Sequence, residues 1–277
     1  MTPLVALYGV GDCYLVCSLA RTFERHHGKV PLIVVKPSHR FIPEWFGLGY
    51  EVNEKMVAAG EAGERGLHQT YDNAIVDGSP VYVHPHFVKT ATRLDQLTIK
   101  SRVSQADMYR ALMQLPPDAP MEKPPLVRVA PFEDQVVVIP RSRSWPNIDG
   151  PFWDALVSRL RESGKRVATF LPQWSLKELI EVCIASGEII GPQCGVLSVA
   201  CEAGFHGHKT ICIRELGPDC PYLFGLTQTM PYGHCSTFAG NDHPNVDHIL
   251  VAPDNWQSKV DIIVEGCRRG WLANGDV

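Results

Sequence analysis

The opening of the chain alternates between strand and helix signals, and this alternation constrains the fold more than any other feature. A short apolar run, Leu4–Tyr8, leads into Gly9-Val10-Gly11-Asp12 and then into a helical pattern from Cys13 to His27. Gly28 ends that pattern, and Pro31–Val35 is a second apolar run. A strand–helix–strand opening of this kind implies a parallel sheet with helices on its faces.

The same alternation starts again after a proline-rich segment at 116–125, which is the best linker candidate in the chain. Further strands are expected at 74–76, 81–83, 136–139, 166–171, 188–190 and 210–213, and helices at 105–115, 152–163, 176–186, 196–204 and 254–270. The chain has 277 residues, and domains usually contain roughly 100–200. We therefore predict an α/β protein of two Rossmann-like domains facing a cleft, with the N-terminal domain at 1–125 and the C-terminal domain at 126–277.

Composition and charge narrow the possible partners. The net charge is −4, whereas a protein that grips a long stretch of nucleic acid usually has a basic surface, so extended nucleic-acid binding is not expected. No apolar stretch reaches the ~18 residues of a membrane span, and the N-terminus lacks the charged start and cleavage site of a signal peptide. We expect a cytoplasmic protein, in which the nine scattered cysteines serve as small buried residues.

Gly11 and Asp12 follow the first strand, where ligands bind in open parallel sheets. A glycine there allows a ligand to approach the backbone closely, and a carboxylate could take a proton from an attacking hydroxyl. Asp12 could equally be a cap of the following helix. A dinucleotide fingerprint would need a third glycine where Tyr14 stands and an acid near Lys36, so a dehydrogenase is disfavoured.

Arg141, Ser142 and Arg143 follow the first strand of the second half. Two arginines and two hydroxyls, counting Ser144, suit a phosphate group and would stabilise a departing diphosphate. A solvated basic loop is the alternative, but the position directly after a strand favours the phosphate interpretation.

The segment from Gln193 to Ser198 begins a helix directly after a strand. The first turn of a helix offers backbone N–H groups and a positive dipole end, so Gln193, Cys194, Gly195 and Ser198 are candidates for holding an anion. Cys194 could be an activated nucleophile at that helix start, but a buried cysteine is the more common case. Neither the histidines nor the cysteines match a zinc template, and the chain contains no Asp-x-Asp pair, so no metal site or cofactor is predicted.

Taken in order, these motifs resemble the heptosyltransferases, glycosyltransferases of the two-domain GT-B fold. The similarity lies in the Gly11-Asp12 helix start, in Tyr71-Asp72, in Arg143-Ser144-Trp145-Pro146 with the aromatic-led helix at Phe152, and in a loose match to Gly-x-Asp-Ser/Thr-Gly at Gly191–Gly195. It extends from residue 4 to about 215. The motifs are short, and their order and spacing carry the resemblance.

The resemblance implies an inverting transfer of a sugar from a nucleoside-diphosphate sugar to an acceptor hydroxyl, without a metal. Asp12 would be the general base in an N-terminal acceptor domain. Gly11, Arg141, Ser142, Arg143, Gln193, Cys194, Gly195 and Ser198 would hold the donor, mostly in the C-terminal domain, and the terminal helix would pack back on the first domain.

This chain departs from the pattern at three positions, with Gln193 in place of Asp, Cys194 in place of Ser/Thr and Val199 in place of His. Three alternatives therefore stay open, namely a glycosyltransferase acting on modified DNA bases, a sugar-nucleotide epimerase of the same fold, and a non-catalytic nucleotide-binding protein. The sugar, the base and the acceptor, whether carbohydrate-like or another hydroxyl compound, are left unnamed by the sequence.

Overall fold

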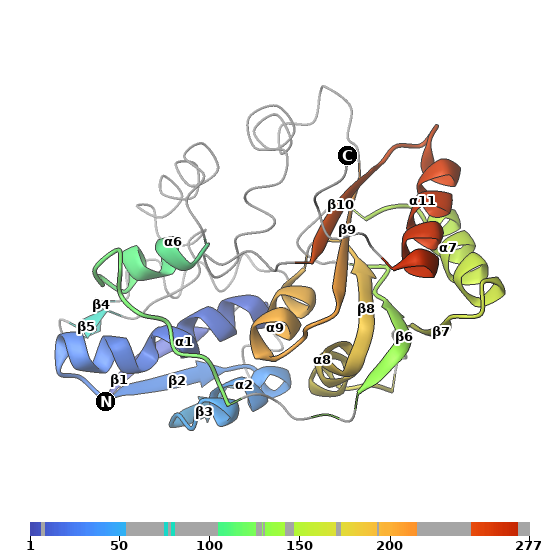
Figure 1. Cartoon of the computed structure of the whole chain (residues 1–277). Helices are drawn as coiled ribbons and strands as arrows, with labels where there is room; N and C mark the ends of the chain where they lie inside the picture. Colours follow the sequence, from blue (N-terminus) through green and yellow to red (C-terminus); the bar gives the residue numbers. More distant parts are fainter. Residues whose placement is uncertain are drawn as a thin grey trace. The chain divides into compact units, whose positions relative to one another are not determined.

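The computed structural model describes most of the chain. The described residues are 1–6, 9–53, 75–76, 79–80, 105–125, 129, 131–141, 147–169, 173–192, 194–214 and 245–270. They fall into two compact units (Figure 1). Unit 1 contains the described residues up to 125, and unit 2 contains those from 129 to 214 and from 245 to 270. The sheets of the two units are separate within these residues.

Unit 1 is built on a parallel sheet in the order β1-β2-β3. Its elements are β1 (Thr2–Ala6), α1 (Val10–His27), β2 (Pro31–Val35), the 3-10 turn η1 (Pro37–His39), α2 (Phe41–Trp45), β3 (Tyr50–Val52), the short antiparallel pair β4 (Ile75–Val76) and β5 (Ser79–Pro80), and α6 (Gln105–Leu112). The predicted βαβ opening is confirmed. Its second strand has the expected bounds, and the predicted strand at 81–83 lies outside the described residues.

Helix α1 begins at Val10, three residues earlier than the sequence pattern predicted. Gly9 is its N-cap, so Gly11 and Asp12 lie in the first turn and not in a loop before the helix. The helix ends where it was expected to end. Gly28 adopts φ 65°, a left-handed conformation that glycine takes at little energetic cost, and its N–H donates to the carbonyl of Glu24.

The proline-rich segment is anchored along α1 over its described part. Thr22 Oγ1 donates to the carbonyl of Pro120 at 2.7 Å, and the N–H of Glu122 donates to the carbonyl of Ser18 at 2.8 Å. Arg25 Nη1 forms an ion pair with Glu122 Oε1 at 2.9 Å. The segment up to 125 is therefore part of the packing of unit 1, and the division between the units falls just after it.

Unit 2 is a five-stranded parallel sheet in the order β7-β6-β8-β9-β10. Its elements are β6 (Phe132–Val138), α7 (Gly150–Glu162), β7 (Arg166–Thr169), α8 (Leu176–Ala185), β8 (Ser186–Gly191), α9 (Gly195–Ala203), β9 (His208–Arg214), β10 (Val246–Val251) and α11 (Trp256–Arg269). Strand β10 was missed by the sequence analysis, although the run Val246–Val251 is mostly apolar. The region 217–244, expected to be irregular, lies outside the described residues.

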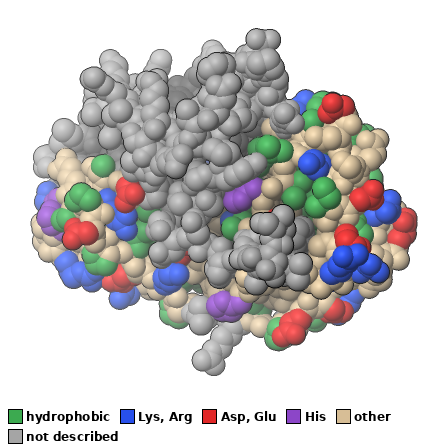
Figure 2. Space-filling view, turned by 45° about the horizontal axis from the view of Figure 1, so that its top comes forward, with side chains coloured by type: hydrophobic (Ala, Val, Ile, Leu, Met, Phe, Trp, Pro, Cys, Tyr) green, Lys and Arg blue, Asp and Glu red, His purple; other side chains and the backbone are tan. Residues whose placement is uncertain are grey.

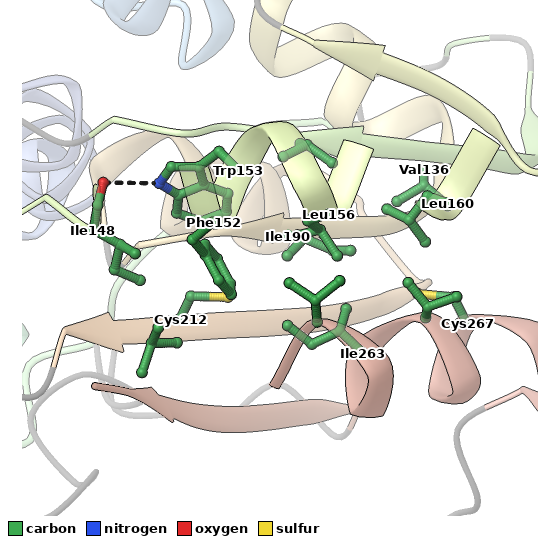
Figure 3. Packing of buried hydrophobic residues seen from close by; sticks show 14 residues of the cluster. Val136, Ile148, Phe152, Trp153, Leu156, Leu160, Ile190, Cys212, Ile263 and Cys267 are labelled. Atoms are coloured by element: carbon green, nitrogen blue, oxygen red, sulfur yellow. Dashed lines mark hydrogen bonds between the residues drawn. The ribbon is translucent and has the colours of Figure 1, made fainter. Parts of the chain in front are cut away.

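Helices cover both faces of this sheet (Figure 1). α7 packs against α11 and α8 packs against α9, as expected for right-handed crossovers that change direction once. The core beneath α7 and α11 contains Phe152, Leu156 and Ile263, which are all 2% exposed or less (Figure 3). The buried Trp153 satisfies its indole N–H by donating to the carbonyl of Ile148 at 3.2 Å.

Cysteines in the described residues are buried or half-buried and free of disulfides, in agreement with their predicted role; they are Cys13, Cys17, Cys183, Cys194, Cys201, Cys212 and Cys267. Within the part of the chain that the structure describes, no helix combines the length and apolar character needed to cross a membrane.

Candidate functional site

One candidate site lies at the start of α1 in unit 1. Asp12 is the third residue of the helix, and its carboxylate Oδ2 accepts a hydrogen bond from the backbone N–H of the N-cap Gly9 at 3.0 Å. This contact is the returning half of a capping box, and a negative charge in the first turn is also favoured by the helix dipole. The helix-cap interpretation of Asp12 therefore has a structural basis, and its catalytic role stays a prediction.

A second donor holds the other oxygen of this carboxylate. Tyr109, from helix α6, donates its phenolic O–H to Asp12 Oδ1 at 2.7 Å. Tyr109 is 2% exposed, whereas Asp12 is half-buried. Tyr109 was not predicted as a site residue, because 97 residues separate it from Asp12 and no local motif marks the pair.

A separate candidate site, described by itself, is the carboxyl edge of the sheet in unit 2. The connection from β6 leads to β7 on one side, and the connection from β7 crosses back to β8 on the other side of β6. The gap between β6 and β8 is thus the topological switch point, where open α/β sheets bind their ligands. Arg141 follows β6, and Cys194 and Gly195 follow β8, so the structure brings these candidates to one place in the sheet.

Close packing holds these two strand ends together. The N–H of Ile139 donates to the carbonyl of Ile190 at 2.8 Å, which continues the pairing past the end of β6. A Cβ on Gly191 would lie 2.8 Å from the carbonyl oxygen of Ile139, closer than real Cβ atoms come. Because Gly191 has no side chain, the ends of β6 and β8 can stay at the usual spacing of neighbouring strands, about 4.8 Å.

Helix α9 begins at Gly195 with Cys194 as its N-cap. The N–H of Ser198 already donates to the carbonyl of Cys194 at 3.2 Å, and the Ser198 side chain is buried, so Ser198 contributes to the helix and not to its exposed end. The N–H groups of Gly195, Val196 and Leu197 precede the first intrahelical bond, and those of Val196 and Leu197 hydrogen-bond to the Cys194 sulfur. Val199, where the resembled family has histidine, is fully buried.

Burial raises the pKa of the Cys194 thiol, and the backbone N–H groups of Leu197 and Val196 act in the opposite direction. A raised pKa leaves the thiol protonated at neutral pH, which disfavours the alternative that Cys194 is a nucleophile.

Arg214 is a further cation at this edge that the sequence analysis did not identify. It ends β9, the strand next to β8, and its Nη1 donates to the carbonyl of Asn147 at 3.0 Å. Asp149 Oδ1, at the N-cap of α7, lies 3.8 Å from the same nitrogen. The sequence signal that could have indicated Arg214 is a charged residue at the end of an apolar strand run.

Some predicted residues are not placed by the structure. These are Ser142, Arg143 and Gln193, which lie outside the described residues. Gly11, by contrast, is described, and it is buried in the first turn of α1 in unit 1. Among the described side chains, no group of three or more His, Cys, Asp or Glu residues gathers as a metal site would require. On the face drawn in Figure 2, acidic and basic side chains are intermixed over the described surface.

Solved structures with the same fold were found, although no protein-family model and no curated protein matches the sequence. The Escherichia coli heptosyltransferase WaaC with ADP is 13% identical, with a TM-score of 0.54 over 96% of this chain and 99% of that one. Escherichia coli ADP-heptose LPS heptosyltransferase II is also 13% identical, with a TM-score of 0.53 over the same shares of the two chains. The chain has the heptosyltransferase fold.

A third structure is the iron-containing dodecameric glycosyltransferase TibC from enterotoxigenic Escherichia coli. It is 11% identical, with a TM-score of 0.50 over 98% of this chain and 77% of that one. These likenesses confirm the predicted fold class, α/β with two Rossmann-like units of GT-B type. At such low identity these likenesses show the fold alone.

Proposed function

We propose that the protein is a glycosyltransferase that moves a sugar from a nucleoside-diphosphate sugar to an acceptor hydroxyl. The observation that carries this proposal is the Asp12 carboxylate, held by two donors in the helix turn that follows the first parallel strand of a heptosyltransferase-type fold. Two of the matched structures are described with ADP or as ADP-heptose enzymes, which supports a nucleotide sugar as the donor class.

In the proposed reaction, Asp12 takes the proton of the acceptor hydroxyl. The acceptor oxygen forms a bond to the anomeric carbon while the bond from that carbon to the diphosphate oxygen breaks, and the electron pair leaves with the nucleoside diphosphate. A single displacement inverts the anomeric carbon. Positioning of the two substrates and stabilisation of the developing charge supply most of the rate.

The leaving diphosphate is assigned to unit 2. Arg141 and the N-terminus of α9 provide positive charge and N–H donors beside the switch point, and Ser142, Arg143 and Gln193 are kept as predicted contacts. The N-terminal unit is proposed as the acceptor domain and the C-terminal unit as the donor domain. The reaction as proposed uses no metal, because the cationic groups named above take that role.

Replacing Asp12 with Asn tests the proposal. The Asn side chain can still accept from the Gly9 N–H and can donate to the Tyr109 oxygen, so α1 should keep its shape while the proton acceptor is lost. Once a donor is found by a thermal-shift screen of nucleotide sugars, we expect turnover to fall by about 10²–10⁴-fold with donor affinity unchanged. Turnover is measured as release of the nucleoside diphosphate, and near-wild-type turnover would leave Asp12 as a helix cap alone.

A non-catalytic nucleotide-binding protein is the second candidate. The buried Val199 and the structural use of the Asp12 carboxylate favour it, because both are compatible with a fold kept without its chemistry. A wild-type protein that binds a nucleotide sugar, yet neither transfers nor hydrolyses it, would decide for this candidate. Formation of an epimerised sugar nucleotide without an acceptor would instead identify an epimerase.

A further inference from the structure

The phenol of Tyr109 donates a hydrogen bond to the side chain of Asp12, a contact that packing of α6 against α1 does not by itself require. Tyr109 lies in α6, which packs against α1, and its ring is almost completely buried. A buried tyrosine hydroxyl usually finds a hydrogen-bond partner, and a backbone carbonyl would serve that purpose. Here the partner is the Asp12 carboxylate at 2.7 Å, and a hydrogen bond to an ionised acceptor is stronger than one between neutral groups.

The two oxygens of Asp12 have different surroundings. Oδ1 meets the buried phenol of Tyr109, whereas Oδ2 lies beside the exposed backbone of Gly9. A Cβ at residue 9 would lie 3.2 Å from Oδ2, tighter than most Cβ contacts in proteins, so any side chain there would crowd this oxygen. A substrate hydroxyl that approaches from the exposed side of the turn would therefore meet Oδ2.

We propose that Tyr109 is a positioning residue for the base Asp12, holding Oδ1 so that Oδ2 is the oxygen that takes the acceptor proton. This inference rests on the proposed function. The torsion that orients a carboxylate is broad and roughly two-fold, so an aspartate held at one oxygen alone can turn away from a substrate. The phenol fixes this torsion, and it keeps its own proton throughout the reaction. The proton accepted by Oδ2 passes to solvent after transfer.

The test compares four proteins: the wild type, Tyr109→Phe, Asp12→Asn and the double variant. Phe keeps the buried ring and removes the hydroxyl alone. We expect Tyr109→Phe to lower kcat by about 10–100-fold, the usual effect of a misplaced catalytic group, with KM for the donor unchanged. In the Asp12→Asn background the same change should have no further effect on kcat, because Tyr109 acts through the Asp12 carboxylate.

Tyr50→Phe is the matched control. Tyr50 also belongs to unit 1, and its hydroxyl donates to Glu44 Oε1 at 2.6 Å, so this variant removes the same kind of tyrosine–carboxylate bond outside the proposed site. Its kcat should equal that of the wild type. Thermal unfolding of the wild type, Tyr109→Phe, Asp12→Ala and their double variant gives a second cycle. Because Ala, unlike Asn, cannot bond to the phenol, coupling between residues 12 and 109 in this cycle reports the hydrogen bond independently of activity.

The outcomes are distinguishable. A wild type that is active, with Tyr109→Phe equally active, would leave Tyr109 as a packing residue and overturn the inference while the proposed function stands. Absence of coupling in the unfolding cycle, or an equal loss of kcat from Tyr109→Phe in both backgrounds, would also overturn it. A wild type that turns over no nucleotide sugar, although unfolding still shows the coupling, would refute the proposed function and with it the role of Tyr109.

Discussion

At the residue scale, Arg141 is the candidate donor contact that the structure describes most directly. It is exposed, and it stands two residues beyond Ile139, whose backbone pairs with the end of β8. Arg141 and the N-terminus of α9 leave the sheet at the same edge, so a diphosphate bound there is the proposed partner of this guanidinium.

Replacing Arg141 with Ala should weaken the binding of a nucleoside diphosphate by about 1.5–3 kcal/mol, or about 10- to 150-fold in Kd, the usual worth of a hydrogen bond to a charged group. Calorimetry on the wild type and the variant measures this loss. Arg166 provides a charge-matched control, because it begins β7 and pairs with Asp134 at 3.3 Å near the opposite edge of the sheet. If Arg166→Ala weakened binding as much as Arg141→Ala, a general charge effect would replace the specific contact.

At the element scale, the spacing of β6 and β8 decides whether the switch point can form. Gly191 ends β8 against the carbonyl oxygen of Ile139, which belongs to the backbone and cannot rotate away as a flexible side chain would. Any side chain at residue 191 must push the two strand ends apart.

Gly191→Ala should therefore lower the free energy of unfolding by about 1–3 kcal/mol, as overpacking of a tight contact usually does, and should also weaken nucleotide binding. Denaturant unfolding and calorimetry on the same protein give the two quantities. Gly49→Ala is the matched control, because a Cβ there meets no atom within 4 Å and its φ is not positive. Wild-type stability in Gly191→Ala would show that the strands separate easily and that the site does not depend on their spacing.

At the scale of the whole molecule, the proposed mechanism neutralises the departing diphosphate with cationic side chains and a helix end. One structure of the same fold, TibC, is described as iron-containing, so the prediction that this protein needs no metal calls for a direct test. Metal dependence is therefore tested on the complete protein.

Treatment with EDTA, followed by its removal, should leave turnover within about two-fold of the untreated enzyme, because the departing charge is neutralised by protein groups. Turnover is measured with and without added Mg²⁺, Mn²⁺ or Fe²⁺. The metal content of the purified protein is measured as well. A loss of activity that one of these ions restores would show that the reaction passes through a bound metal.

Local physics made much of the fold predictable. The bounds of β2 and the end of α1 at Gly28 follow from apolar runs and from a glycine that accepts a left-handed conformation. The α/β class followed from the alternation of these elements. Strand β10 was missed because its apolar run contains Asp247 and His248, and the burial it receives comes from β9 and α11, which the sequence does not display.

The candidate site was predictable only in part. Asp12, Arg141 and Gly195 were predicted as site residues because each lies just after a predicted strand. The carboxyl ends of parallel strands are where such folds bind ligands. The sequence by itself determined the α/β plan with two Rossmann-like units, and these site positions stay predictions. Only the tertiary structure decided that β6 and β8 are neighbours, that Arg214 ends the strand beside them, and that Tyr109 reaches Asp12. Contacts between distant segments depend on packing, and no local pattern of residues encodes that packing.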